Sequence, residues 1–287
     1  MIPRVLIIAG SDSGGGAGIQ ADINTVTMLG GHAMTAITAI TAQNTLGVQA
    51  VHPIPADVVV AQMRSVIDDL GVDAVKIGMI GSAATAHAVA DVLETLDVPM
   101  VFDPVMIASS GSILADDATI AAFERLMRRA AIVTPNLPEL AALTGRSLES
   151  ETDALAAAHD LAAHIGCAVL AKGGHRPPAR TGPVRASDGA IGDDRLADNL
   201  VMPDGTDIVW THPRIDTRHS HGTGCTLASG IATGLAEGLA LADAVGRSVA
   251  YVQAALAAAP GLGAGHGPMG HSLGLTPFTA LAAACRD

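Results

Sequence analysis

Aromatic residues are scarce in this sequence: they make up 2% of its 287 residues, although hydrophobic residues as a whole make up 49%. The core must therefore consist of Ala, Val, Leu, Ile and Met, a composition that suits helices packed closely on a sheet. The scarcity also argues against single-stranded nucleic-acid binding, which depends on aromatic side chains that stack on bases. The net charge of −12 argues the same way, because an acidic protein repels phosphate backbones and anionic membranes.

Long apolar runs and paired cysteines are also missing. No run reaches the roughly 18 apolar residues of a membrane span, and the apolar start after Arg4 is too short for a signal-peptide core. Cys167, Cys225 and Cys285 are far apart, which disfavours a disulfide framework or a structural zinc site. We therefore expect a cytoplasmic protein that has no membrane or nucleic-acid partner. Such an acidic protein must hold any phosphate ligand with helix N-termini, a few cations or Mg²⁺.

Short apolar runs alternate with segments of helical period along the first 171 residues. The runs predict strands at Val5–Ala9, Met34–Thr41, Val72–Ile77, Val98–Phe102, Ala131–Val133 and Cys167–Ala171. The intervening stripes predict helices at Ile19–Leu29, Pro55–Leu70, Thr85–Leu96, Ala118–Arg129 and around Leu155–Ile165. Nearly all-apolar strands joined by helices are typical of a parallel sheet that is covered on both faces. The predicted fold is an α/β three-layer α/β/α sandwich with a mostly parallel sheet, formed by residues 1–287 as a single domain.

The pattern changes between residues 176 and 216. Two short runs, Leu200–Met202 and Ile208–Trp210, flank Asp204-Gly205 and predict a hairpin at the sheet edge. Helical patterning resumes after Cys225 and continues through Asp243–Ala258. The tail, about 276–287, receives no assignment.

Polar or glycine residues follow five of the predicted strands. The segments are Gly10-Ser11-Asp12, Lys76-Ile77-Gly78-Met79, Asp103-Pro104-Val105-Met106, Thr134-Pro135-Asn136 and Lys172-Gly173-Gly174-His175. Ligands of open α/β sheets bind at the carboxyl ends of the strands, so together these segments predict a site. Strand-end loops are often polar in any case, so each segment alone is weak evidence.

The first glycine-rich segment, Gly10–Gly18, follows a strand and precedes a helix. Its end, Gly16–Ala21, matches a GxGxxA dinucleotide-binding pattern, which makes an NAD-dependent oxidoreductase one alternative. The turn is longer than that pattern requires, and residues 34–43 lack the acid that would bind the ribose. No Gly-Lys-[Ser/Thr] follows, which excludes a Walker A loop. A loop on the substrate side is the favoured interpretation.

The second glycine-rich segment is His221-Gly222-Thr223-Gly224-Cys225, before a helix predicted to begin at Thr226. Two glycines and a helix N-terminus form an anion site, with backbone N–H groups pointing at the ligand. The helix terminus is expected to lower the pKa of Cys225 and favour its thiolate. The residues alone leave open an ordinary capped turn that contains a structural cysteine.

The combined motifs resemble the hydroxymethylpyrimidine/phosphomethylpyrimidine kinases of the ribokinase-like superfamily. The resemblance rests on the strand-end segments above, on residues 221–225, and on Ala9–Asp22, Thr41-Ala42-Gln43-Asn44-Thr45 and Thr134–Glu139. These motifs occur in the family's order from residue 5 to about residue 270. The match is weakest at Arg218-His219-Ser220 and over Arg176–Asp198.

The resemblance implies a substrate, 4-amino-5-hydroxymethyl-2-methylpyrimidine and then its monophosphate, with ATP and Mg²⁺. It implies that Gly10, Asp22 and Gln43 hydrogen-bond the pyrimidine and that Met79 and Val105 pack on the ring. For the phosphate side it implies Lys172, Gly222, Thr223 and Gly224 as ligands of the phosphoryl groups, and Asp103, Asn136 and Glu139 as Mg²⁺ residues, through water. Cys225 would accept the hydroxymethyl proton. The family also favours a homodimer.

Two alternatives to this kinase remain beside the oxidoreductase. Pyridoxal/pyridoxine kinases of the same superfamily phosphorylate a hydroxymethyl group on a similar flat heterocycle. A non-catalytic regulator would bind the pyrimidine without ATP turnover, and the presence of Lys172, Asn136, Glu139 and Cys225 together disfavours it.

Overall fold

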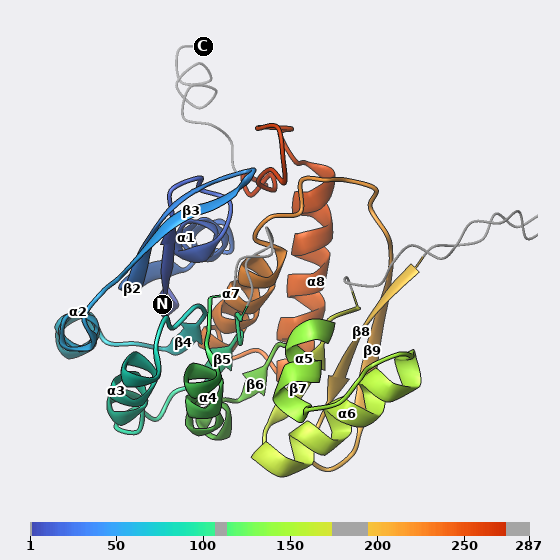
Figure 1. Ribbon diagram of the computed structural model, residues 1–287, viewed down its shortest axis with the longest axis horizontal. Helices are drawn as coiled ribbons and strands as arrows, with labels where there is room; N and C mark the ends of the chain where they lie inside the picture. Colours follow the sequence, from blue (N-terminus) through green and yellow to red (C-terminus); the bar gives the residue numbers. More distant parts are fainter. Residues whose placement is uncertain (1, 107–113, 174–194, 274–287) are drawn as a thin grey trace, which may run out of the picture.

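A computed structural model describes residues 2–106, 114–173 and 195–273 of the chain (Figure 1). Its strands are β1 (Arg4–Asp12), β2 (His32–Asn44), β3 (Gly47–Pro53), β4 (Ala74–Ile77), β5 (Met100–Phe102), β6 (Ile132–Val133), β7 (Ala168–Ala171), β8 (Arg195–Val201) and β9 (Asp207–Pro213). Its helices are α1 (Gly18–Met28), α2 (Ala56–Leu70), α3 (Ala83–Leu93), α4 (Asp117–Arg129), α5 (Leu137–Thr144), α6 (Glu151–Ile165), α7 (Thr223–Ala236) and α8 (Leu241–Ala257).

The described strands form one sheet in the order β3-β2-β1-β4-β5-β6-β7-β8-β9. The six adjacent strands β2, β1, β4, β5, β6 and β7 run parallel to one another. β3 pairs antiparallel with β2 at one edge, and β8 and β9 pair antiparallel at the other. The parallel ladders follow from the helical crossovers, which return the chain to the same end of the sheet before each new strand. The predicted mostly parallel α/β/α architecture is confirmed.

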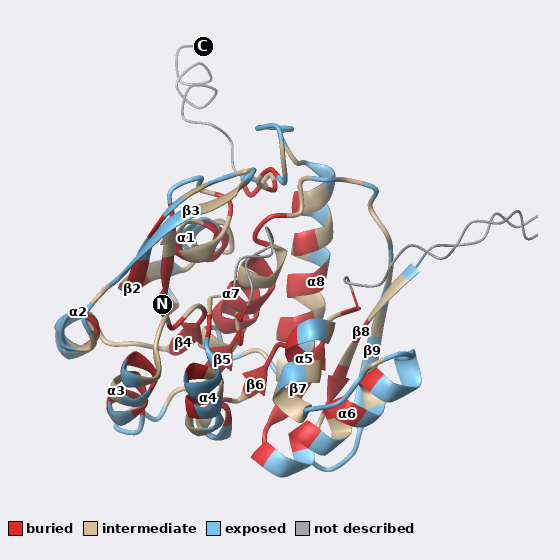
Figure 2. Cartoon of the chain, in the orientation of Figure 1, coloured by how far each residue is buried: buried red, intermediate tan, exposed pale blue. Residues whose placement is uncertain are grey.

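Helices cover both faces of the sheet, and the alternation of side chains along β1 shows how. Leu6 and Ile8 point into a core formed with α2, α3, α4 and α6, while Val5 and Ile7 point into a second core formed with α1, α7 and α8. All four residues are fully buried. Strands β4, β5 and β6, in the middle of the sheet, are likewise coloured as buried in Figure 2. An apolar strand is therefore stable here because each face has its own layer of helices.

Two secondary-structure elements, β3 and α5, were not predicted from the sequence. β3 is a short edge strand whose residues are mostly exposed, so it lacks the apolar pattern that marks the central strands. α5 is only eight residues long and begins with a capping box, a feature of Asn136 and Glu139 that the sequence analysis interpreted only as chemistry. The predicted hairpin is present but longer, as β8 and β9 pair from Arg195↔Pro213 to Val201↔Asp207. No helix of the described residues has the length and apolar character needed to cross a membrane.

Candidate active site

A cavity of about 880 Å³ lies at the carboxyl ends of the parallel strands. Twelve of the thirteen residues predicted for the site line it: Gly10, Gln43, Met79, Asp103, Val105, Asn136, Glu139, Lys172, Gly222, Thr223, Gly224 and Cys225. Asp22 is the exception. The parallel sheet thus brings together residues separated by up to 215 positions in the sequence, between Gly10 and Cys225.

The anion loop, residues 221–225, is held against the first glycine-rich loop. Gly222 has φ +89°, and a Cβ added there would lie 1.9 Å from the carbonyl oxygen of Gly16. Only glycine meets both the conformation and the close approach. α7 begins at Thr223 rather than at the predicted Thr226, with Gly222 as its N-cap. Gly224 and Cys225 therefore lie within the first turn, where backbone N–H groups have no partner inside the helix.

Lys172 and Asp103 face this loop. Lys172 Nζ lies 2.7 Å from Asp103 Oδ1, and a Cβ added at Gly224 would lie 3.1 Å from Lys172 Nζ and 3.3 Å from Asp103 Oδ2. Thr134 donates a hydrogen bond to the same Asp103 oxygen at 3.0 Å. A largely buried lysine, 13% exposed, and a helix N-terminus converge here, which is the charge pattern that binds phosphate.

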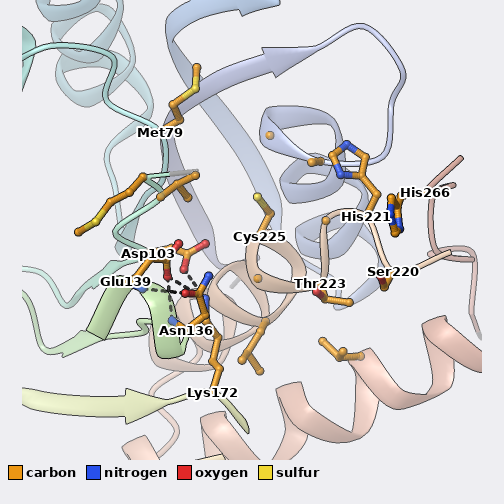
Figure 3. Close-up of a pocket in the computed structure, with 18 of the residues that line it drawn as sticks. Met79, Asp103, Asn136, Glu139, Lys172, Ser220, His221, Thr223, Cys225 and His266 are labelled. Atoms are coloured by element: carbon orange, nitrogen blue, oxygen red, sulfur yellow. Dashed lines mark hydrogen bonds and ion pairs between the residues drawn. The ribbon is translucent and has the colours of Figure 1, made fainter. Parts of the chain in front are cut away.

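Asn136 and Glu139 form the capping box of α5. Asn136 Oδ1 accepts from the Glu139 backbone N–H at 2.9 Å, and Glu139 Oε2 accepts from the Asn136 N–H at 2.8 Å. The Asn-x-x-Glu spacing therefore has a structural use of its own. Glu139 Oε2 also lies 3.8 Å from Lys172 Nζ, which links the cap to the lysine–carboxylate cluster (Figure 3).

Glu139 is an unusual carboxyl group. Burial, opposed by Lys172 and reinforced by Asp103, raises its pKa to about 7. Two carboxylates and an amide oxygen match Mg²⁺, which prefers hard oxygen ligands and takes only one or two protein carboxylates beside substrate phosphates and water. No group of three or more His, Cys, Asp or Glu suited to a metal occurs among the described residues, so an all-protein metal cage is not what this part of the chain offers.

Cys225 lies in the cavity, between the carboxylate cluster and His221 in the view of Figure 3. Its pKa is raised to about 11, not lowered as the sequence predicted. Burial is the main cause, and the charges of Asp22 and Asp103 add to it, while Lys76 opposes it. The prediction from the helix terminus was wrong because it neglected the cost of burying a thiolate among carboxylates.

Asp22 does not line the cavity. It is fully buried, accepts from Lys76 Nζ at 2.8 Å and from Ser229 Oγ at 2.7 Å, and so joins β4 to α7. Burial would lower the pKa of Lys76, but the charges of Asp22, Cys225 and Asp103 outweigh it and raise that pKa, so the lysine is charged. In this structure Asp22 is thus apart from the other predicted ring-binding residues, and its carboxylate neutralises a buried cation.

The predicted ring-binding residues Gly10, Gln43, Met79 and Val105 also line the cavity. Met79 packs against Gly10, where an added Cβ would come within 2.3 Å of the Met79 methyl carbon. Gln43 lies beside Asp12 and His221, two cavity-lining residues to which the sequence analysis assigned no role. Their pairing joins segments 209 residues apart, and nothing in the local sequence marks it.

An apolar end of the cavity was also missed. The lining residues that share this character are Leu196, Ile215, Leu227, Val249, Val252 and Leu256. They come from β8, the segment after β9, α7 and α8. The hairpin is joined to Gly173, the residue after Lys172, through Asp198, which accepts from the Gly173 N–H at 2.9 Å. A predicted edge hairpin gave no reason to expect a cavity wall. Gly174 and His175, also noted in the sequence, lie outside the described residues.

The geometry agrees with comparisons to known proteins. Residues 12–270 match the family model described as phosphomethylpyrimidine kinase. A hydroxymethylpyrimidine/phosphomethylpyrimidine kinase of Streptomyces coelicolor is 44% identical over 277 residues, covering 95% of this chain and 96% of the relative. The crystal structure of phosphomethylpyrimidine kinase from Clostridium difficile 630 is 35% identical, with a TM-score of 0.71, over 89% of this chain and 99% of that one. An ADP complex of Bacillus subtilis pyridoxal kinase is 30% identical, with a TM-score of 0.82, over 98% and 99%.

Proposed function

Because the chain belongs to the phosphomethylpyrimidine kinase family, we propose that it transfers a phosphoryl group from ATP to the hydroxymethyl group of 4-amino-5-hydroxymethyl-2-methylpyrimidine. A second transfer, to the resulting monophosphate, would complete the diphosphate for thiamine biosynthesis. The observation that carries the proposal is one cavity lined by both an amide-and-methionine wall and a lysine–carboxylate cluster. Neither an NAD-dependent oxidoreductase nor a non-catalytic binding protein requires that combination.

The acceptor alcohol binds on the Gly10 side. Gln43 supplies a hydrogen-bond donor and an acceptor for the aminopyrimidine, and Met79 and Val105 pack on the flat ring. Asp22 has no place in this contact, since its carboxylate is occupied by Lys76 and Ser229. The ring is held by neutral groups, as suits a neutral substrate.

The donor nucleotide binds on the Lys172 side. Lys172 and the backbone N–H groups of Gly222, Thr223 and Gly224 hold the phosphoryl oxygens. Asp103, Glu139 and Asn136 would hold Mg²⁺, through water, and a bound ion would supply charge neutralisation for the phosphates. The apolar end between the hairpin and α8 accommodates the adenine, because a flat base needs an apolar wall beside the phosphate site.

Cys225 accepts the proton of the attacking hydroxymethyl group. It stands at the first turn of α7, where the acceptor and donor sides of the cavity meet. Phosphoryl transfer proceeds through a loose transition state, so positioning and charge neutralisation carry most of the catalysis and the proton leaves late. Only the thiolate form of Cys225 can accept this proton, and with a pKa of about 11 that form is scarce near neutrality and more abundant in alkaline solution.

The protein acts as a cytoplasmic homodimer. The use of ATP supports the compartment. The dimer is supported by exposed apolar side chains on β2, β3 and their turn, where Ile40 is 49%, Leu46 70% and Val51 44% exposed. Light scattering of the native chain and of Val51→Asp tests the dimer: a change to monomer is expected, and a native monomer would contradict it.

The proposed reaction is tested by incubating the purified protein with MgATP and the alcohol, and separately with its monophosphate. Mass spectrometry should show a gain of one phosphoryl group on each substrate, with one ADP formed per product. Formation of ADP without a phosphorylated pyrimidine would contradict the assignment. Lys172→Met, which removes the cation beside Asp103 and the anion loop, serves as the blank after circular dichroism has shown that it is folded.

A further inference from the structure

Asp12, His221 and Gln43 form a chain of polar contacts that the proposed reaction leaves without a role. His221 Nε2 lies 2.9 Å from Asp12 Oδ2 and 3.0 Å from the atom assigned as Gln43 Nε2. The side chains of Asp12 and His221 are only 4% and 10% exposed. Groups so well buried must match as donors and acceptors, because an unmatched polar contact costs free energy.

Asp12 fixes the proton on His221. Its carboxylate accepts backbone N–H groups from Gly14, Gly16 and Ala17 at 2.8 to 3.1 Å. Burial would raise the pKa of Asp12, but hydrogen bonds from His221, Gly14 and Ala17 more than offset it and hold that pKa below its ordinary value. An ionised carboxylate only accepts, so His221 Nε2 must carry its one hydrogen whether the ring is neutral or charged. Gln43 can share that hydrogen with Asp12, in a three-centre bond, only by presenting its oxygen.

Thr41 fixes the opposite end of the Gln43 amide. Its hydroxyl oxygen lies 2.9 Å from the backbone carbonyl oxygen of Ser11 and 3.2 Å from the atom assigned as Gln43 Oε1. A carbonyl only accepts, so the single hydroxyl hydrogen goes to Ser11. Thr41 then has only lone pairs to offer Gln43.

Both contacts of the amide are mismatched as its atoms are assigned: nitrogen faces a donor at His221, and oxygen faces an acceptor at Thr41. The two amide orientations have nearly the same shape and differ by a 180° rotation that moves nothing else. We propose that the Asp12–His221 pair and Thr41 lock Gln43 with its oxygen toward His221 and its NH₂ toward Thr41, and that this locked amide reads the amino-substituted edge of the pyrimidine. Asp12, His221 and Thr41 are then positioning residues for substrate specificity.

The locked amide has a defined recognition capacity. Its oxygen keeps one lone pair after accepting from His221, and its nitrogen keeps one N–H after donating to Thr41. That pair complements an exocyclic amino group beside a ring nitrogen, which offers one donor and one acceptor. This part of the inference rests on the proposed function, whereas the amide orientation does not.

Neutron diffraction from deuterium-exchanged crystals of the full chain tests the orientation directly. We expect a deuteron on His221 Nε2 and an ND₂ group on the Gln43 atom nearest Thr41. An ND₂ group nearest His221 would overturn the proposal. The result is independent of turnover, so it stands even if the proposed reaction fails.

Substrate discrimination tests the specificity role, with His221→Gln as the variant and His164→Gln as its matched control. His164 is on α6, 63% exposed, and receives the same chemical change away from the cavity. Calorimetry would compare binding of the aminopyrimidine alcohol with that of the analogue lacking the amino group. We expect His221→Gln to reduce the ratio of the two affinities about tenfold, the order of one hydrogen bond. A purely structural role for His221 would reduce the affinity for both ligands equally and leave the ratio of the two affinities unchanged. An unchanged ratio therefore overturns the specificity role. If the native chain phosphorylates no pyrimidine, the proposed function fails instead.

Discussion

Replacing Cys225 with alanine separates proton transfer from phosphate positioning. The loop backbone supplies the anion site and Lys172 is untouched, so the KM for ATP should change little. What disappears is the group that accepts the hydroxymethyl proton. General-base catalysis contributes about 10²–10⁴-fold to an enzymatic rate, so the fall in kcat should approach that range only as the thiolate becomes populated at alkaline pH.

The raised pKa sets where that loss is visible. With a pKa of about 11, about one Cys225 in a thousand is ionised at pH 8 and about one in a hundred at pH 9. The kcat of the native enzyme should therefore rise about tenfold per pH unit over this interval. Cys225→Ala should follow a flat, lower profile, and the difference between the two should widen as the pH increases.

The assay is a coupled measurement of ADP release with the pyrimidine alcohol saturating, from pH 7 to 9.5. Lys172→Met is the control that should lose ATP binding at every pH. Cys167→Ala is the matched cysteine control, since Cys167 is buried in the core beside Met127 and is not among the residues that line the cavity. Native-like turnover by Cys225→Ala, or parallel profiles for the two proteins, would refute proton transfer to Cys225 and leave it a structural part of the loop.

Three further predictions follow from the same geometry. Lys76→Met should lower the free energy of unfolding by about 3–5 kcal/mol in urea titrations, because it leaves the Asp22 carboxylate buried alone. The double variant Lys76→Met, Asp22→Asn should lose much less free energy of unfolding. Equal losses in the two proteins would contradict a buried ion pair. Glu139 is protonated below its pKa of about 7 and ionised above it, so the Mg²⁺ concentration for half-maximal activity should decrease as the pH is raised from 6 to 8. Glu139→Gln should abolish this pH dependence. A pH dependence that persists in the variant would assign it to another group. Gly222→Ala should reduce kcat/KM about 100-fold or more in the ADP assay, because a Cβ at φ +89° collides with the Gly16 carbonyl and displaces the anion loop. Wild-type kinetics would show that the anion loop and the first glycine-rich loop need not be in contact.

Much of the fold was predictable because the signals were local. Several central strands are apolar on both faces and are followed by a helix with an apolar stripe, as in β1 with α1 or β5 with α4. β3 escaped because an exposed edge strand has no such pattern. α5 escaped because its eight residues are too few to show a period, although its capping box is present in the sequence.

The site was predictable to the extent that parallel strands share one end. That rule was enough to expect Asp103 and Lys172 together, and they form an ion pair. The rule does not say which way a helical side chain faces, and Asp22, on α1, points into the core toward Lys76. Nor does it give the electrostatic environment. The pKa of Cys225 depends on burial and on Asp22, Asp103 and Lys76, none of which is adjacent in sequence.

Substrate identity is the central claim, and structural similarity alone does not decide it, because pyridoxal kinases share the fold. The most direct measurement is kcat/KM for the aminopyrimidine alcohol and for pyridoxine, with the same enzyme preparation and saturating MgATP. We predict that kcat/KM for the aminopyrimidine alcohol is at least about 100-fold higher than for pyridoxine, since only the aminopyrimidine ring offers the amino group and adjacent ring nitrogen that Gln43 recognises. A higher value for pyridoxine would contradict the account.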